Sequence, residues 1–168
     1  MVIRIKLTPR FLAQVGIVAA LYAGLTIVFH PISYGPLQVR ISEALTVLPF
    51  IFPAAIPGLT LGCAIANIFG PFGLIDVVVG STLTLMAALL TARMPRPWLA
   101  PVPPILVNAA GLSFYLPTMA GLPLVGGIPY LSTFLAVAIG QTVACYLLGY
   151  PLLLVLLRRR FRGDRNTH

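Results

Sequence analysis

Long apolar stretches separated by short turns occupy most of this sequence, and they constrain its fold more than any other feature. Six stretches are apolar enough to form helices in lipid, at about residues 11–29, 39–52, 58–69, 74–92, 102–114 and 130–157. A helix needs about 20 residues to cross the hydrocarbon core of a bilayer. Charged residues make up only 8% of the chain, whereas a soluble domain has about 25%. The sequence therefore predicts an all-α integral membrane protein with six transmembrane helices, forming a single membrane domain over residues 1–168.

Proline and glycine mark the predicted turns. Pro53, Pro57 and Gly58 lie between the second and third stretches, which favours a tight turn over one interrupted helix. Residues 32–36 and 70–73 are predicted as turns, and residues 115–129 as a loop, for the same reason. The second and third stretches are too short to span lipid comfortably. Short or interrupted membrane segments often lie near the substrate site of a transporter.

Clusters of basic residues determine the predicted orientation in the membrane. Nine of the eleven basic residues lie in three clusters, at 4–10, 93–96 and 158–162, and each cluster flanks an apolar stretch. Cytoplasmic loops of membrane proteins carry an excess of Lys and Arg. Six spans place all three clusters on the cytoplasmic side, so both termini, including the tail 158–168, are predicted to be cytoplasmic. The net charge of +8 therefore reflects topology, and no nucleic-acid binding is predicted.

Two carboxylates are expected inside the membrane near its outer face. Glu43 and Asp76 each lie in the first turn or so of a predicted span, and Arg40 is three residues before Glu43. On one helix, Arg40 and Glu43 would share a face. Ionisable groups in a membrane are costly and usually face a bundle interior or a wet cavity. Simple neutralisation by Arg40, of Glu43 or of Asp76, is the structural alternative to a role in ligand binding.

Other polar side chains are expected at a similar depth. Asn67, Asn108 and Gln141 lie within predicted spans, whereas Tyr34 and Tyr115 lie in predicted outer loops. Amides in spans either hold helices together or contact a ligand. Tyrosines at the interface either anchor the chain or stack on a flat ligand. Their shared depth with the two carboxylates predicts a common substrate pocket.

No catalytic or metal-binding pattern is present in the sequence. There is no nucleotide-binding motif and no metal-ligand cluster, and His30 has no partner at catalytic spacing. Cys63 and Cys145 lie inside apolar stretches and are expected to be small buried residues. We therefore predict that the chain is not an enzyme and holds no cofactor. ATP-driven transport would require partner subunits that hydrolyse ATP.

Small residues spaced four apart predict a helix contact in the first stretch. Ala19 and Ala23 form one pair, Ala20 and Gly24 form a second, and Gly16 lies one turn earlier. Such pairs let another helix approach closely and gain van der Waals contact. These five residues form the predicted surface for a partner subunit.

Several motifs resemble one transporter family. AALYA at 19–23, PISYGPLQVRISEALTVLP at 31–49, AIPGL at 55–59 and LGCAIAN at 61–67 are similar to the queuosine-precursor transporter (QueT) family. Its members are substrate-binding S components of energy-coupling factor (ECF) transporters. The resemblance runs through most of the chain. Ala54 departs from it, since an acidic residue is expected there, and this departure concerns partner docking more than substrate recognition.

The resemblance implies an ECF S-component-like bundle in the bacterial cell membrane. The implied ligand is 7-aminomethyl-7-deazaguanine or a close 7-deazapurine, loaded from the outer face. The implied partners are a membrane-embedded T component, which would meet the small residues of the first span, and two ATPases. Carboxylates can accept the N–H donors of a guanine-like edge and can pair with the cationic aminomethyl group. In this scheme Arg40 orients Glu43.

Two other functions remain open on the residues alone. A self-contained secondary carrier or channel for a small polar solute is the main alternative, although no acidic residue lies in the middle of a span to relay protons. A small membrane enzyme would need carboxylates or histidines clustered at the cytoplasmic face, and the sequence has no such cluster.

Overall fold

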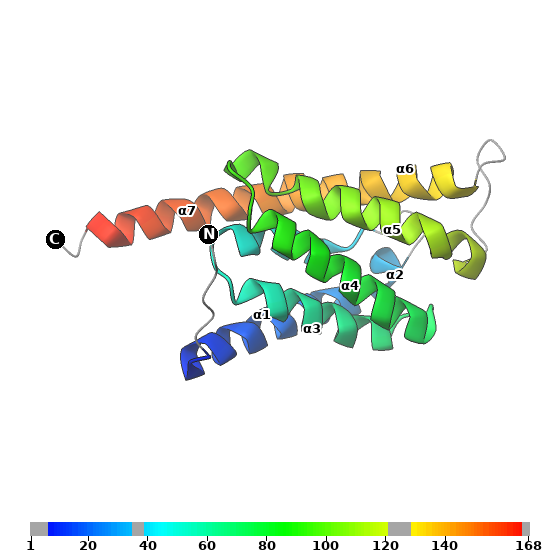
Figure 1. Ribbon diagram of the computed structural model, residues 1–168, viewed down its shortest axis with the longest axis horizontal. Coiled ribbons are helices and arrows are strands. Elements are labelled where there is room, and N and C mark those ends of the chain that lie inside the picture. The colour runs from blue at the N-terminus through cyan, green and yellow to red at the C-terminus, as the bar shows by residue number, and fades with distance from the viewer. Residues whose placement is uncertain (1–6, 35–38, 121–128, 166–168) are drawn as a thin grey trace.

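The computed structural model describes residues 7–34, 39–120 and 129–165, and it confirms the all-α prediction for this part of the chain, which contains no strand. In chain order the elements are α1 (Pro9–Val28), α2 (His30–Ser33), η1 (Ile41–Phe50), α3 (Ala55–Ile68), α4 (Gly73–Thr91), η2 (Pro97–Leu99), α5 (Val102–Ala120), α6 (Pro129–Thr142), η3 (Val143–Gly149) and α7 (Tyr150–Arg165). The longer helices run roughly along the long axis of the molecule, and α7 projects from one end (Figure 1).

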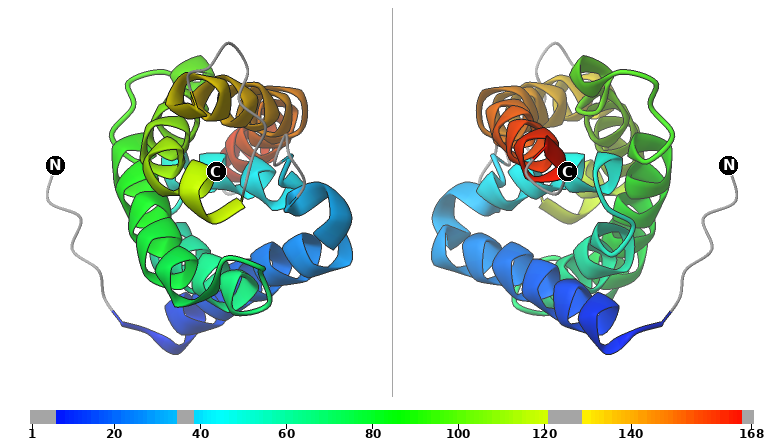
Figure 2. Two further views of the ribbon diagram at one scale, coloured as in Figure 1. Left: turned by 90° about the vertical axis from the view of Figure 1, so that its right-hand side faces the viewer. Right: turned by 90° about the vertical axis from the view of Figure 1, so that its left-hand side faces the viewer.

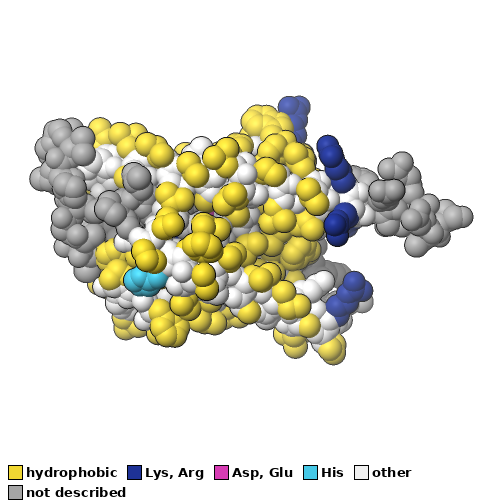
Figure 3. Space-filling view, turned by 180° about the vertical axis from the view of Figure 1, so that it is seen from behind, with side chains coloured by type: hydrophobic (Ala, Val, Ile, Leu, Met, Phe, Trp, Pro, Cys, Tyr) yellow, Lys and Arg dark blue, Asp and Glu magenta, His cyan; other side chains and the backbone are white. Residues whose placement is uncertain are grey.

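Three helices in the described ranges are long and apolar enough to cross a membrane. They are Pro9–Val28, Gly73–Thr91 and the continuous helix Pro129–Arg160, whereas Ile41–Phe50 and Ala55–Ile68 are apolar but shorter. Apolar side chains cover most of the face seen in Figure 3, as lipid contact requires. The structure is that of a helical membrane protein, and the count of six spans stays a prediction.

Helix boundaries differ from the predicted ones in four places. The turn before α3 is shorter than expected, because α3 begins at Ala55 and takes Pro57 into its first turn, where no N–H is needed. The predicted outer loop begins later, because α5 continues to Ala120. Most of the predicted tail is helical, because α7 continues to Arg165. Finally, α2 forms one helical turn where only a loop was predicted.

The second apolar stretch forms the centre of the bundle. It is the 3₁₀-helix η1, which rises about 2.0 Å per residue where an α-helix rises about 1.5 Å. Residues 42–49 are all buried, and η1 contacts α1, α3, α4, α7 and η3, which enclose it in the end-on views of Figure 2. Eight consecutive buried residues, with no face left to solvent or lipid, place this segment inside the bundle. Burial therefore stabilises a stretch that is too short to span lipid alone.

The π-helical segment η3 lies against η1. A Cβ at Gly149 would lie 2.8 Å from the backbone oxygen of Ala44, so glycine is what allows this close approach. Pro151 follows two residues later; it lacks an N–H and crowds the preceding turn of an α-helix. The wider turns of η3 accommodate it without ending the helix.

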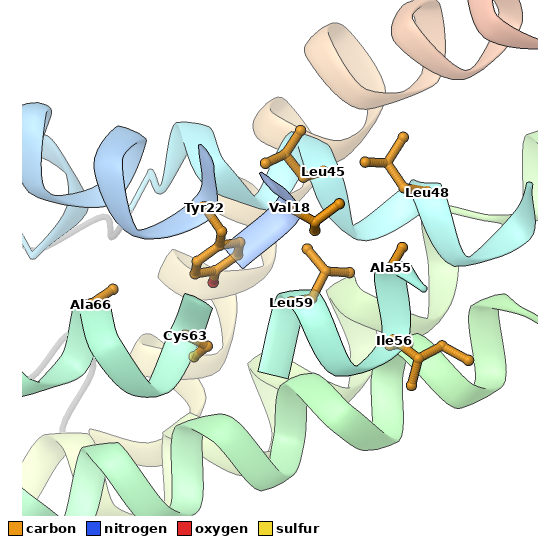
Figure 4. Close-up of a cluster of buried hydrophobic side chains, with 10 residues drawn as sticks. Val18, Tyr22, Leu45, Leu48, Ala55, Ile56, Leu59, Cys63 and Ala66 are labelled. Atoms are coloured by element: carbon orange, nitrogen blue, oxygen red, sulfur yellow. The ribbon is translucent and has the colours of Figure 1, made fainter. Parts of the chain in front are cut away.

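Small residues and one tyrosine join α1 to α3. A Cβ at Gly62 would lie 2.8 Å from the backbone oxygen of Ala19 and 2.8 Å from Cβ of Tyr22, so no larger residue fits there. The fully buried Tyr22 side chain points into the core toward Cys63 (Figure 4). The other buried members of this core are Val18, Leu45, Leu48, Ala55, Ile56, Leu59, Ala66 and Ala88. This packing fixes α1, η1 and α3 relative to one another.

Exposed arginines gather at one end of the molecule (Figure 3). The exposed arginines of the described residues are Arg10, Arg93, Arg96, Arg158, Arg159 and Arg160. They belong to the start of α1, the turn after α4 and the end of α7, so segments far apart in the sequence place their positive charges together. This grouping agrees with a common side for the three basic clusters. Which side faces the cytoplasm stays a prediction.

Candidate functional site

A cluster of buried polar residues lies within the bundle, and we call it the polar cluster. The residues come from α1, from η1 and the residue before it, and from α3, α4, α5 and α6. Its members are Tyr22, Arg40, Glu43, Asn67, Asp76, Asn108 and Gln141, and none is more than 4% exposed. Buried polar groups of this kind need partners within the protein or in a bound molecule.

The Glu43 carboxylate accepts hydrogen bonds from two different helices. The hydroxyl of Tyr22 donates to Oε1 at 2.5 Å, and Nδ2 of Asn108 donates to Oε2 at 3.3 Å. The backbone carbonyl of Glu43 also accepts from Oγ1 of Thr46 at 2.6 Å and from Sγ of Cys145 at 3.5 Å. Both carboxylate oxygens of Glu43 therefore face a donor from the protein.

Arg40 forms an ion pair with Asp76. Nη2 of Arg40 lies 3.5 Å from Oδ2 of Asp76, and Cζ lies 5.0 Å from the centroid of the Tyr34 ring, which is within cation–π range. The hydroxyl of Tyr34 donates to the backbone oxygen of Ala66 at 2.7 Å. Nδ2 of Asn67 donates to the backbone oxygen of Asp76 at 2.8 Å. Arg40 therefore belongs to a network that joins α3 to α4.

The expectation that Arg40 orients Glu43 is corrected by this pairing. Arg40 precedes η1 and has an extended backbone, with φ −82° and ψ 107°. The rule that residues three apart share a face holds only where both are helical. Among the described residues, the salt bridge that Arg40 forms is the one with Asp76, which is the structural alternative given by the sequence.

The formal charges of the polar cluster do not cancel. Arg40 balances Asp76, and the Glu43 carboxylate then remains as one negative charge in excess. Its hydrogen bonds to Tyr22 and Asn108 offset part of the cost of burial. An uncompensated buried charge is still expensive, so the cluster suits a bound molecule that carries one positive charge.

Some polar atoms of this region have no hydrogen-bond partner among the described residues. They include Nε of Arg40, Oδ1 of Asn67 and Oγ of Ser33, and all three are buried. Leaving a buried donor or acceptor unsatisfied costs about 1–3 kcal/mol. Native proteins avoid that cost with bound water or with a ligand. These atoms are therefore candidates for contact with a buried water or with a bound molecule.

A comparison with models of protein families identifies the family of this chain. The model described as "QueT transporter" matches residues 12–158, which include the whole polar cluster. The chain belongs to the QueT transporter family. The family is one of transporters and not of enzymes, in agreement with the prediction from sequence.

A curated relative carries the family name. The queuosine precursor transporter QueT of Lactococcus lactis subsp. cremoris (strain MG1363) is 43% identical over 77 residues. The aligned part spans 45% of this chain and 45% of the relative's length. No solved structure matches the chain. The QueT family is thus assigned on sequence, while the polar cluster comes from the structure.

Nearly all the predicted site residues come together in this QueT-family chain. The polar cluster contains Arg40, Glu43, Asn67, Asp76, Asn108 and Gln141, and Tyr34 lies at its edge, stacked on Arg40. Gln141 lies close enough to interact with the Glu43 carboxylate. The side chain of Tyr115 lies outside the described residues. That these residues bind a ligand stays a prediction.

Tyr22 is the member of the polar cluster that sequence reasoning missed. Thr26, one turn later, faces η1 as well, with its Oγ1 2.7 Å from Oγ of Ser42. Polar residues at i and i+4 on an apolar helix are the signal that could have identified this face. Small residues around Tyr22 mask this signal, because they are typical of a surface that packs on another helix.

The small residues of α1 are divided between two faces of the helix. Ala19 and Ala23 are each 6% exposed and belong to the face that packs on α3, so the prediction that they meet a partner is wrong. Gly16, Ala20 and Gly24 are exposed on successive turns. A Cβ at Gly16 or Gly24 would meet nothing within 4 Å. We call these three residues the small-residue ridge.

Proposed function

We propose that this chain is the substrate-binding S component of an ATP-driven ECF importer for a queuosine precursor. The ligand would be 7-aminomethyl-7-deazaguanine or a close 7-deazapurine. Family membership and the name of the curated relative support the substrate class. The observation that carries the proposal is the buried Glu43 carboxylate, which accepts from Tyr22 and Asn108 but has no cationic partner at salt-bridge distance among the described residues. The aminomethyl group is cationic near neutral pH and would supply the missing positive charge.

The remaining members of the polar cluster would hold the flat ring. Asn108 and Gln141 offer amide groups beside Glu43, and amides can both donate and accept. Tyr34 presents an aromatic face near Arg40. A small number of polar groups in an otherwise apolar surrounding is typical of sites for small molecules. Tyr115 is proposed as a second aromatic contact.

The proposed topology has six spans in the bacterial cell membrane, with both termini cytoplasmic and loading from the outer face. The exposed arginines lie at one end of the molecule (Figure 3), and α2 lies toward the other end (Figure 1). Because basic residues favour the cytoplasmic side, the end that carries α2 and Tyr34 would face outward.

Cysteine labelling tests this orientation. His30→Cys, in α2, is expected to react with a membrane-impermeant maleimide in intact cells, whereas Arg96→Cys should react only after permeabilisation. Both positions are exposed, and the native Cys63 and Cys145 are buried, so background labelling should be low. Labelling of Arg96→Cys from outside would contradict the proposed topology.

The proposed partners are a T component and two ATPases. The small-residue ridge would meet the T component, because Gly16, Ala20 and Gly24 are exposed and let a second helix approach closely. The partners would hydrolyse ATP, so this chain would hold no cofactor of its own. Binding and energy use would then reside in separate subunits.

Ligand binding by the purified protein tests the proposed function. 7-Aminomethyl-7-deazaguanine is expected to bind at least about tenfold more tightly than the neutral 7-cyano analogue, because only the former offers a charge-assisted bond to Glu43. Calorimetry or thermal-shift titration in detergent measures both affinities, with guanine as a further comparison. If no 7-deazapurine binds, the proposal fails. Uptake by the isolated protein in liposomes, driven by an ion gradient alone, would instead favour a self-contained carrier.

A further inference from the structure

Arg40 and Asn67 each have one buried side-chain atom without a hydrogen-bond partner among the described residues. These atoms are Nε of Arg40 and Oδ1 of Asn67, both buried. The side chain of Arg40 is held by its other atoms, since Nη2 lies 3.5 Å from Asp76 and Cζ stacks on Tyr34. Its Nε–H is consequently a fixed donor that is free to meet an acceptor.

The orientation of the Asn67 amide is also fixed. Nδ2 donates to the backbone oxygen of Asp76 at 2.8 Å and lies 3.5 Å from Sγ of Cys63. A flipped amide would place Oδ1 against that carbonyl oxygen, so the hydrogen-bond network assigns the two atoms. A Cβ at Gly80 would lie 2.6 Å from Nδ2, which means that the α4 backbone closes off that side. Oδ1 is left as a fixed acceptor.

We propose that these two atoms recognise the lactam edge of the ligand. A ring carbonyl oxygen would accept from Nε of Arg40, and the neighbouring ring N–H would donate to Oδ1 of Asn67. Both side chains contact Asp76. Arg40 contacts its carboxylate, and Asn67 contacts its backbone carbonyl oxygen. This assignment rests on the proposed function, because it takes a 7-deazapurine as the ligand. It leaves Glu43 for the cationic group.

The donor and acceptor determine which bases fit. Guanine carries an oxygen at position 6 beside a ring N–H, whereas a 6-amino base carries an N–H₂ donor beside a bare ring nitrogen. A 6-amino ligand would set donor against donor at Arg40 and acceptor against acceptor at Asn67. A buried site built for hydrogen bonds strongly rejects ligands that leave its groups unpaired.

Two ligands that differ only at this edge test the proposal. They are 7-aminomethyl-7-deazaguanine and its 2,6-diaminopurine counterpart, in which an amino group replaces the 6-oxo group. The parent protein is expected to bind the first at least about a hundredfold more tightly. In Arg40→Lys a methylene carbon takes the position of Nε, while the ammonium group keeps a positive charge beside Asp76. The ratio of the two affinities should fall by at least about tenfold in this variant.

Arg93→Lys is the matched control, because it makes the same chemical change at an exposed position and should leave the ratio unchanged. Equal binding of the two ligands by the parent would overturn the proposal, while the proposed function would stand on the binding of the first. If Arg40→Lys kept the parent's ratio of affinities for the two ligands, the proposal would also be overturned. Nε of Arg40 would then be assigned to a contact with a buried water. If the parent binds neither ligand, the proposed function itself fails. If Arg40→Lys does not fold, the ratio of the two affinities in the parent protein still tests the proposal.

Discussion

Replacing Glu43 with glutamine is expected to weaken binding of 7-aminomethyl-7-deazaguanine by at least about a hundredfold. Glutamine has nearly the same size, so the bundle loses little packing, but the excess negative charge of the polar cluster disappears. Removing one partner of a buried ion pair costs about 3–5 kcal/mol, because the other charge is left uncompensated. Calorimetric titration of the purified variant in detergent measures the loss.

The loss should depend on the charge of the ligand. For the neutral 7-cyano analogue, Glu43→Gln is expected to change the affinity by less than about tenfold, since only hydrogen bonding is altered. Thr26→Val is the matched control: it removes the contact of Thr26 with Ser42 in the same α1–η1 interface and leaves the carboxylate untouched. Parent-like binding of the cationic ligand by a folded Glu43→Gln variant would contradict the assignment of Glu43.

Much of the fold could be predicted from the sequence, because apolar length and proline or glycine content act locally. The elements α1, η1, α3, α4 and α5 begin within a few residues of the predicted stretches. The 3₁₀ geometry of η1 could not be predicted, since it depends on burial by five other elements. The extension of α5 through Pro117 could not be predicted, because proline and glycine after residue 115 are typical of a loop. A proline removes one hydrogen bond of a helix but can kink it without ending it.

The sequence predicted which residues belong to the candidate site better than it predicted the contacts among them. Polar residues are so rare in the apolar stretches that Glu43, Asp76 and the three amides were evident from sequence. Their partners depend on backbone conformation, as the extended Arg40 demonstrates. The role of α1 was harder to predict, because apolar residues lie on all its sides and the pair Tyr22 and Thr26 is a weak sign of which face is buried. That ambiguity hid Tyr22 and assigned Ala19 to the wrong surface.

Leucine at position 20 is expected to abolish ATP-driven uptake while leaving ligand binding within about threefold of the parent value. Ala20 is the central residue of the small-residue ridge and is exposed on α1. A leucine side chain there would hold a partner helix away and remove the close backbone contact that small residues allow. Co-expression with the T component and both ATPases, followed by co-purification and uptake in liposomes, measures the effect.

Two further leucine substitutions separate docking from folding. Ala110→Leu, at an exposed position of α5, should co-purify and transport like the parent, because an added apolar side chain there only meets lipid. Ala19→Leu should instead lower the unfolding temperature, since the backbone of Ala19 already approaches Gly62 as closely as glycine permits and overpacking strains the core. If Ala20→Leu assembles and transports normally, the ridge does not contact the T component. The opposite face of α1 is already packed on α3, so a partner would then have to dock on other helices.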